Sequence, residues 1–364
     1  MARRFDPGLP VPRKHQEKRE DTSATDTLWL RVSAFLSTRT PNTQDTYLGV
    51  LKEWCAFLRA EPGSAKAAQA ILSATDEKAI SYRNWLSERP GERPRAAGDS
   101  SMRRTTPLRQ KKMGLENTLS NATIAKKFAV LRRLYRMLVA CDLGIRSNPF
   151  DSDRVPPPPK DSGRKRPTEM IEFALVKKII AEPDTRNPKG IRDKALLSAL
   201  FGGALRRSEA AALRLGDVRK SSRGTVFLYL RSTKAKRDAE QALPKWAAGA
   251  IEALLRHRQS EGAGSGDYLF VGYTGRGGNV PTAEPISTSG IYRLFKHYCE
   301  LAGAGQFVTP HSARATAITR LLDAGIAHRE VQEFSRHRSI QMVELYDKRR
   351  IGVDDNPAKM LDFE

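Results

Sequence analysis

The sequence is short of cysteine and of long apolar runs. Its three cysteines, Cys55, Cys141 and Cys299, are widely separated in apolar, helix-like segments, which excludes a disulfide framework and a cysteine-type zinc site. No window approaches the ~18 consecutive apolar residues of a membrane span. Residues 1–25 form a basic stretch, expected to be a flexible tail, without the apolar core of a secretion signal. We therefore expect a cytoplasmic protein with no membrane partner.

Motifs for metal-dependent or nucleotide-driven chemistry are also missing. There is no Glu-x-Lys and no Gly-Lys dipeptide, and the second absence excludes a Walker phosphate loop. The single Asp-x-Asp, at Asp151 and Asp153, opens a proline-rich segment, where a solvated turn is the simpler interpretation. The glycines from Gly262 to Gly278 lack a strand–turn–helix context and indicate a surface loop. We expect neither a cofactor nor a metal.

Positive charge, by contrast, is abundant. The chain has 63 Lys and Arg against 41 Asp and Glu, a formal net charge of +22. A basic proteome would explain the total alone, but clustering favours a polyanionic partner, with nucleic acid the first candidate. Between Glu88 and Lys112, eight basic residues stand against three acidic ones among Pro, Gly and Ser. The candidate phosphate contacts chosen from this segment are Arg103, Arg104, Lys111 and Lys112.

Residues 26–148 have the apolar spacing of a small, all-helical domain. Two helices are expected over 26–60 and a third over 73–86, followed by a long amphipathic helix capped by Ser120. The apolar face of this last helix is formed by Ile124, Phe128, Leu131, Tyr135 and Leu138. Its other face carries three further candidate DNA contacts, Lys126, Arg133 and Arg136.

A second domain is expected over 168–350. It follows a linker at 149–167 that holds six prolines, which favour an extended and semi-rigid spacer. The pattern predicts helices at both ends of this domain, a β-hairpin over 225–244 between them, and a short helix capped by Ser208. The expected fold is therefore mainly α with a small antiparallel β-sheet.

Four short elements of the second domain carry residues that could together cleave a phosphodiester without a metal. Such cleavage needs the phosphate charge neutralised, a nucleophile, and a proton donor for the leaving oxygen. The candidates, in chain order, are Arg206, Lys234, His311, Arg314, His337 and Tyr346. Each element alone has a simpler interpretation as a capping turn, a polar turn, a surface pair or a core tyrosine.

In this order the six residues resemble the active-site signature of the tyrosine recombinases, the phage integrase family. Leu-Arg-Arg-Ser-Glu at 205–209 matches the family's first arginine box, and His311-x-x-Arg314 matches the second. His337, followed nine residues later by Tyr346, matches the third. One departure is Arg336, where the family usually has glycine, and another is Ala313, smaller than the usual apolar residue. The resemblance implies a two-domain DNA clamp, in which a helical core-binding (SAM-like) domain is joined to a mixed α/β catalytic domain.

The resemblance also implies an activity. The protein would be a site-specific recombinase or integrase, of the kind found in mobile elements, that cuts and rejoins duplex DNA through a 3′-phosphotyrosyl link without metal or ATP. Tyr346 would be the nucleophile, and Arg206 and Arg314 would bind the non-bridging oxygens. Lys234 would protonate the leaving 5′ oxygen. The implied roles of the histidines are proton acceptor for His311 and phosphate hydrogen bonding for His337.

The implied partner is double-stranded DNA with paired inverted-repeat half-sites, bound by a homotetramer in the nucleoid with accessory DNA-bending or directionality factors. We expect the C-terminal tail, 351–364, to dock on a neighbouring protomer, and docking on its own domain is the alternative. Other activities of the same chemistry stay open, namely a type IB topoisomerase or a telomere resolvase. A catalytically inactive DNA-binding relative is the alternative from a different class.

Overall fold

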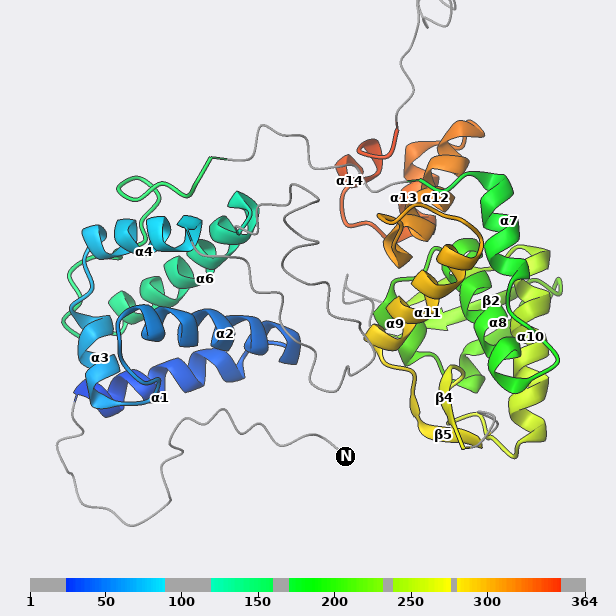
Figure 1. The fold of residues 1–364 in the computed structure, drawn as a ribbon, viewed down its shortest axis with the longest axis horizontal. Coiled ribbons are helices and arrows are strands. Elements are labelled where there is room, and N and C mark those ends of the chain that lie inside the picture. Colours follow the sequence, from blue (N-terminus) through cyan, green and yellow to red (C-terminus); the bar gives the residue numbers. More distant parts are fainter. Residues whose placement is uncertain (1–23, 89–118, 160–169, 232–237, 276–279, 348–364) are drawn as a thin grey trace, which may run out of the picture. The chain divides into compact units, whose positions relative to one another are not determined.

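The computed structural model describes residues 24–88, 119–159, 170–231, 238–275 and 280–347. The chain separates into two compact units, residues 1–165 and residues 166–364. The expectation of a mainly helical protein with a small antiparallel sheet is confirmed, and a second small sheet is also present (Figure 1). Lys234, the four basic residues chosen between 103 and 112, and the tail 351–364 lie outside the described residues.

In the described ranges, the regular structure of the first unit is all helical. Its helices are α1 (Ala24–Ser37), α2 (Pro41–Phe57), α3 (Ala65–Leu72), α4 (Asp76–Glu88) and α6 (Asn121–Ala140). Helix α1 begins inside the stretch expected as a flexible tail. The hydroxyl of Ser64 accepts the Ala67 N–H at 3.1 Å and begins α3, a helix that the apolar spacing did not predict. Ser120 begins α6 as expected, because its hydroxyl accepts the Thr123 N–H at 3.3 Å.

An aromatic cluster forms the centre of the first unit. Trp54 is fully buried, with ring-centroid distances of 4.9 Å to Tyr82 and 5.1 Å to Phe150. Its indole N–H donates to the Tyr135 hydroxyl at 3.0 Å, and this hydroxyl donates to the Ile71 carbonyl at 3.1 Å. The two bonds satisfy both polar groups inside an apolar core, where an unpaired one would be costly.

The segment expected as a linker begins inside this packing. Phe150 and Val155 are fully buried in the core of the first unit, and the Arg132 Nε donates to the Phe150 carbonyl at 2.7 Å. Burial of the Phe150 ring stabilises the fold more than an extended, solvated segment would. The prolines at 156–159 follow with no regular secondary structure.

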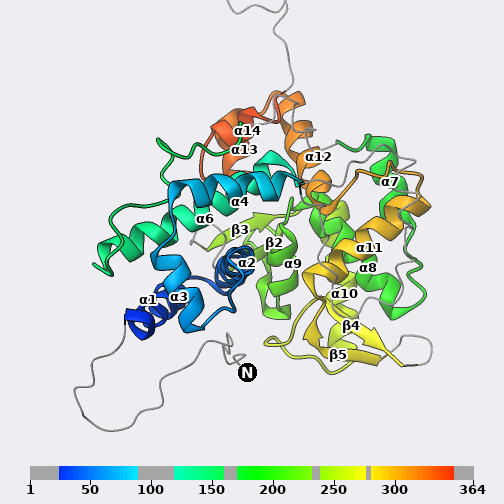
Figure 2. The ribbon, with the colours of Figure 1, turned by 60° about the vertical axis from the view of Figure 1, so that its left-hand side comes forward.

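The second unit surrounds a buried central helix, α8 (Pro188–Gly202), which packs against α10 (Lys245–Ser260) and α12 (Pro310–Asp323). Gly202 allows the close approach of α10, because a Cβ there would lie 2.8 Å from the Ala247 Cβ. Figure 2 shows α12, α13 and α14 gathered at one end of this unit. The remaining helices are α7 (Phe173–Ala181), α9 (Arg207–Ala212), the 3-10 turn η1 (Leu215–Asp217), α11 (Thr288–Leu301), α13 (His328–Ser335) and α14 (Gln341–Glu344).

Two small antiparallel sheets complete the part of the second unit that the structure describes. The expected hairpin is present as β2 (Val226–Leu230) and β3 (Ala239–Ala242), with Leu228 opposite Gln241. The strand β1 (Val218–Lys220) adds to its edge. The second sheet pairs β4 (Val271–Thr274) with β5 (Val280–Pro285), where the sequence had indicated only a surface loop. Strands this short, containing Gly272 and two prolines, give no period-2 signal.

No helix in the described ranges is long and apolar enough to cross a membrane.

Cys55 and Cys299 are buried free thiols, as expected for core residues, and burial raises the pKa of Cys55 to about 11. Such a thiol stays protonated and unreactive at neutral pH.

Candidate active site

Five of the six predicted catalytic residues are described, and the second unit brings their side chains together. Arg206 immediately precedes α9, and Arg314 lies on α12. His311 lies in the first turn of α12, which begins at Pro310 as expected. The other two, His337 and Tyr346, lie on either side of α14. A small core of Ile318, Leu322, Val331 and Val343 holds these last helices together, and Tyr346 packs against it.

Arg314 is the most buried of the group, with only 1% of its surface exposed. Its Nη1 donates to the Ala204 carbonyl at 2.6 Å, and its Nη2 donates to the Ser335 carbonyl. Burial, together with the nearby Arg206 and Arg336, lowers the pKa of Arg314 to about 9, which still leaves the group protonated at neutral pH. A cation this poorly solvated gains strongly from an incoming phosphate oxygen.

Arg206 is held by a carboxylate three residues further on. The two oxygens of Glu209 accept from Arg206, one from the backbone N–H at 2.9 Å and one from Nη1 at 2.5 Å. Our expectation that Ser208 caps this helix is wrong, since α9 begins at Arg207 and Glu209 closes its first turn. Burial alone would raise the pKa of Glu209, but Arg336 and Arg206 outweigh it and keep the pKa below its usual value.

The Tyr346 hydroxyl lies 3.1 Å from Nε2 of His311. Burial lowers the pKa of His311, and Arg314 and Arg206 add to the effect, so the ring is neutral at neutral pH. A neutral ring with its proton on Nδ1 can accept the phenolic proton through Nε2. Burial raises the pKa of Tyr346, while Arg314 and Arg206 oppose that rise by favouring the phenolate.

His337 lies against the other side of the tyrosine. The two rings stack at 5.9 Å and 18°, and the His337 Nδ1 lies 2.9 Å from the Ser335 hydroxyl. Burial lowers the pKa of His337 to about 4, with Arg314 contributing, so this ring is also neutral at neutral pH. It can therefore orient a phosphate by hydrogen bonding without adding charge.

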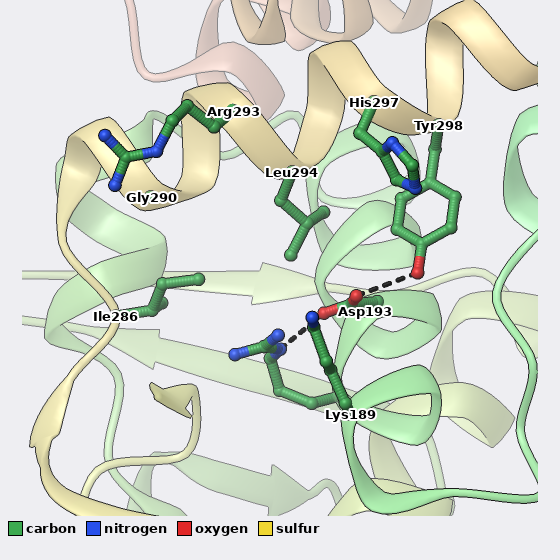
Figure 3. Close-up of a pocket in the computed structure, with 9 residues that line it drawn as sticks. Lys189, Asp193, Ile286, Gly290, Arg293, Leu294, His297 and Tyr298 are labelled. Carbon is green, nitrogen blue, oxygen red and sulfur yellow. Dashed lines mark hydrogen bonds and ion pairs between the residues drawn. The ribbon is translucent and has the colours of Figure 1, made fainter. Parts of the chain in front are cut away.

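A second tyrosine, in a separate hollow, offers a comparison (Figure 3). The hollow of about 370 Å³ lies beside α8 and α11, and there the Tyr298 hydroxyl donates to Asp193 at 2.8 Å. Burial and the neighbouring carboxylate both raise the pKa of Tyr298. Arg192 is occupied by Asp193 and by the Val271 carbonyl, at 2.5 Å and 2.6 Å. The Asp193 carboxylate disfavours a phenolate at Tyr298, so this tyrosine is better suited to a structural role. The arginines near Tyr346 favour the phenolate, which is the form that a nucleophile needs.

Sequence reasoning missed the roles of two residues that support the site. Glu209 was only part of a motif, although its spacing of three residues from Arg206 signalled a contact. Arg336 was noted only as a departure, and it occupies the left-handed region at φ 56° and ψ 39°. A glycine is favoured at such a position because it has no Cβ.

The candidate DNA contacts are described only in part. Lys126, Arg133 and Arg136 are exposed on α6, opposite the five residues of the predicted apolar face, all of which are buried. Within the described ranges, no three His, Cys, Asp or Glu side chains meet in a group that could hold a metal ion.

The chain is similar in sequence to proteins of the family that its motifs resemble. Residues 169–350 match the model of the phage integrase family. The tyrosine recombinase XerC of Pelotomaculum thermopropionicum is 32% identical over 236 residues, covering 63% of this chain and 71% of that protein. The tyrosine recombinase XerD of Neisseria meningitidis is 30% identical over 227 residues, covering 61% and 70%.

Solved structures share the fold. The Tn1549 transposon integrase in complex with circular intermediate DNA matches with a TM-score of 0.57 and 19% identity, covering 93% of this chain and 99% of that one. A lambda integrase dimer bound to a COC′ core site matches with a TM-score of 0.56 and 16% identity, covering 90% and 98%. From its own motifs, its family match and its relatives, this chain belongs to the phage integrase family and is a site-specific tyrosine recombinase.

Proposed function

We propose that this recombinase cuts one DNA strand by joining Tyr346 to the 3′ phosphate. The observation that carries the proposal is the Tyr346 hydroxyl in hydrogen-bonding distance of a neutral His311, beside two arginines. The phenolic oxygen attacks phosphorus and its proton passes to Nε2 of His311. The bond from phosphorus to the 5′ oxygen breaks, and that oxygen takes a proton, which the family resemblance assigns to Lys234.

The two arginines neutralise the phosphate during this step. Each terminal nitrogen of a guanidinium carries two N–H groups, so Arg314 keeps N–H groups for the phosphate beyond those given to the Ala204 and Ser335 carbonyls. One phosphoester bond forms as another breaks, and a 5′ hydroxyl can reverse the step on a new strand. The cycle therefore needs no ATP.

The test uses a nicked duplex carrying the flanking inverted repeats of the gene. A short 5′ fragment diffuses away after cleavage and leaves the protein trapped on DNA. We expect an SDS-resistant adduct in EDTA without nucleotide, because cationic side chains supply the charge that a metal would. An absolute Mg²⁺ requirement for cleavage would contradict the proposed mechanism. Relaxation of any supercoiled plasmid, or closed hairpin products, would favour the topoisomerase or the telomere resolvase instead.

The proposed partner is duplex DNA, and a structural neighbour, the Tn1549 transposon integrase, was solved in complex with circular intermediate DNA. We assign 26–148 to a core-binding domain and 168–350 to the catalytic domain. Neutralising Arg103, Arg104, Lys111 and Lys112 together should weaken binding, since each lost phosphate contact lowers the log–log salt slope by ~0.9. Neutralising Lys126, Arg133 and Arg136 provides a parallel variant on a described helix. If affinity and slope were unchanged in either variant, that set of residues would not contact DNA.

We also propose that recombination requires a homotetramer on paired inverted-repeat half-sites, with accessory bending or directionality factors for some sites. The tail 351–364 contains five apolar residues, Ile351, Val353, Met360, Leu361 and Phe363. Deleting Val353–Glu364 should leave a monomer that binds a half-site but forms no synaptic complex in a native gel. Recombination of two full sites at the wild-type rate by the truncated protein would rule out docking of the tail on a neighbour.

A further inference from the structure

Arg336 has an unfavourable backbone conformation, and its side chain is buried and makes several hydrogen bonds. It lies just after α13 with φ 56° and ψ 39°, a left-handed conformation that disfavours any residue with a Cβ. Its side chain is nevertheless only 6% exposed. Favourable contacts of the side chain are expected to offset this backbone strain.

The guanidinium of Arg336 joins three parts of the second unit. Its Nη2 donates to Glu209 Oε2 and to the Ala204 carbonyl, each at 3.0 Å. Its Nη1 donates to the Phe334 carbonyl at 2.9 Å and to the amide oxygen of Gln241 on β3. The end of α13, the start of α9 and the β2–β3 hairpin therefore meet at one side chain.

Arg336 also contacts the arginine that binds phosphate in the proposed mechanism. Its carbonyl accepts from the Arg206 Nη2 at 3.2 Å, and its guanidinium shares the Glu209 carboxylate with Arg206. The Glu209 carboxylate attracts Arg206 and so competes with the phosphate for it. A second cation on the same carboxylate weakens that competition while keeping Glu209 in place.

We propose that Arg336 is a positioning residue that fixes Glu209 and thereby keeps Arg206 oriented toward the scissile phosphate. The inference rests on the proposed function, since it assigns a role around the same phosphate site. It differs from a purely structural role because it acts on the cleavage step through Glu209.

The test compares Arg336→Gly with the wild-type protein on the nicked substrate. Glycine fits the left-handed backbone, so the variant should fold, and melting temperature checks this. We expect the single-turnover cleavage rate at saturating DNA to fall about 100-fold, while the dissociation constant for DNA stays within about threefold. Arg329→Ala is the matched control, because Arg329 lies on α13, the helix that Arg336 follows, with its side chain 86% exposed.

Two further measurements separate positioning from simple damage. Guanidinium ion, added at millimolar concentration, should restore part of the cleavage rate of Arg336→Gly, whereas NaCl of equal ionic strength should not. In a Glu209→Gln background, Arg336→Gly should slow cleavage by less than about threefold, because the carboxylate through which it acts is already gone.

A cleavage rate of Arg336→Gly within about threefold of the wild type would overturn the proposal. So would a loss that adds fully to that of Glu209→Gln, or no rescue by guanidinium. The failure of the proposed function looks different, because the wild-type protein itself would then form no adduct.

Discussion

Replacing Tyr346 with phenylalanine is expected to abolish the covalent protein–DNA complex, a loss of at least about 10⁴-fold in adduct formation. Only the phenolic oxygen is removed, and with it the hydrogen bond to His311. The ring keeps its stacking on His337 and its packing on the core beneath α14. Affinity for DNA should therefore stay within about threefold, which a mobility shift on the uncut site measures.

The matched control is Tyr298→Phe, the same change in the same unit. The Tyr298 hydroxyl is bonded to Asp193 in the separate hollow of Figure 3, so this variant should still form the adduct. An SDS-resistant adduct with Tyr346→Phe would remove Tyr346 from its proposed role.

Replacing Arg314 with lysine should lower the cleavage rate by about 10²–10³-fold, because a point charge replaces a planar fork at a developing charge. The two terminal nitrogens of Arg314 donate to the Ala204 and Ser335 carbonyls. The single nitrogen of a lysine cannot reach both carbonyls and also bind a phosphate oxygen. The Ala204 carbonyl keeps its hydrogen bond from Arg336, but a Ser335 carbonyl left unpaired should also lower the unfolding free energy by about 1–3 kcal/mol.

Arg320→Lys serves as the control for this variant. Arg320 lies later on α12, is exposed, and contacts the Phe173 ring at 5.6 Å. Single-turnover kinetics and thermal melting of the two variants should therefore diverge. Equal cleavage rates would mean that Arg314 serves only the packing of α12 and α13.

The sequence predicted most accurately the elements whose signals are local. Helix α6 follows from five apolar positions at helical spacing and a serine cap, and all of these are found. The order of the arginine, histidine and tyrosine motifs pointed to residues that the fold brings together, apart from Lys234, which is not described. Their catalytic roles stay predictions.

Features that depend on distant partners could not be predicted. Helix α3 is only 8 residues long, with alanines for much of its buried face. The burial of Phe150 follows from an aromatic cluster assembled from separate helices. The ion pair between Arg336 and Glu209 joins residues 127 positions apart, and no local sequence pattern predicts such a contact.

The aromatic cluster around Trp54 also has a spectroscopic consequence. Of the four tryptophans, Trp29, Trp54 and Trp85 pack in the first unit, and Trp246 lies 49% exposed on α10 in the second. Buried indoles fluoresce at shorter wavelengths than solvent-exposed ones. A shift of the emission maximum on melting would therefore report mainly the unfolding of the first unit. Fluorescence would then miss a loss of order confined to the catalytic residues, whose integrity needs circular dichroism or the adduct assay.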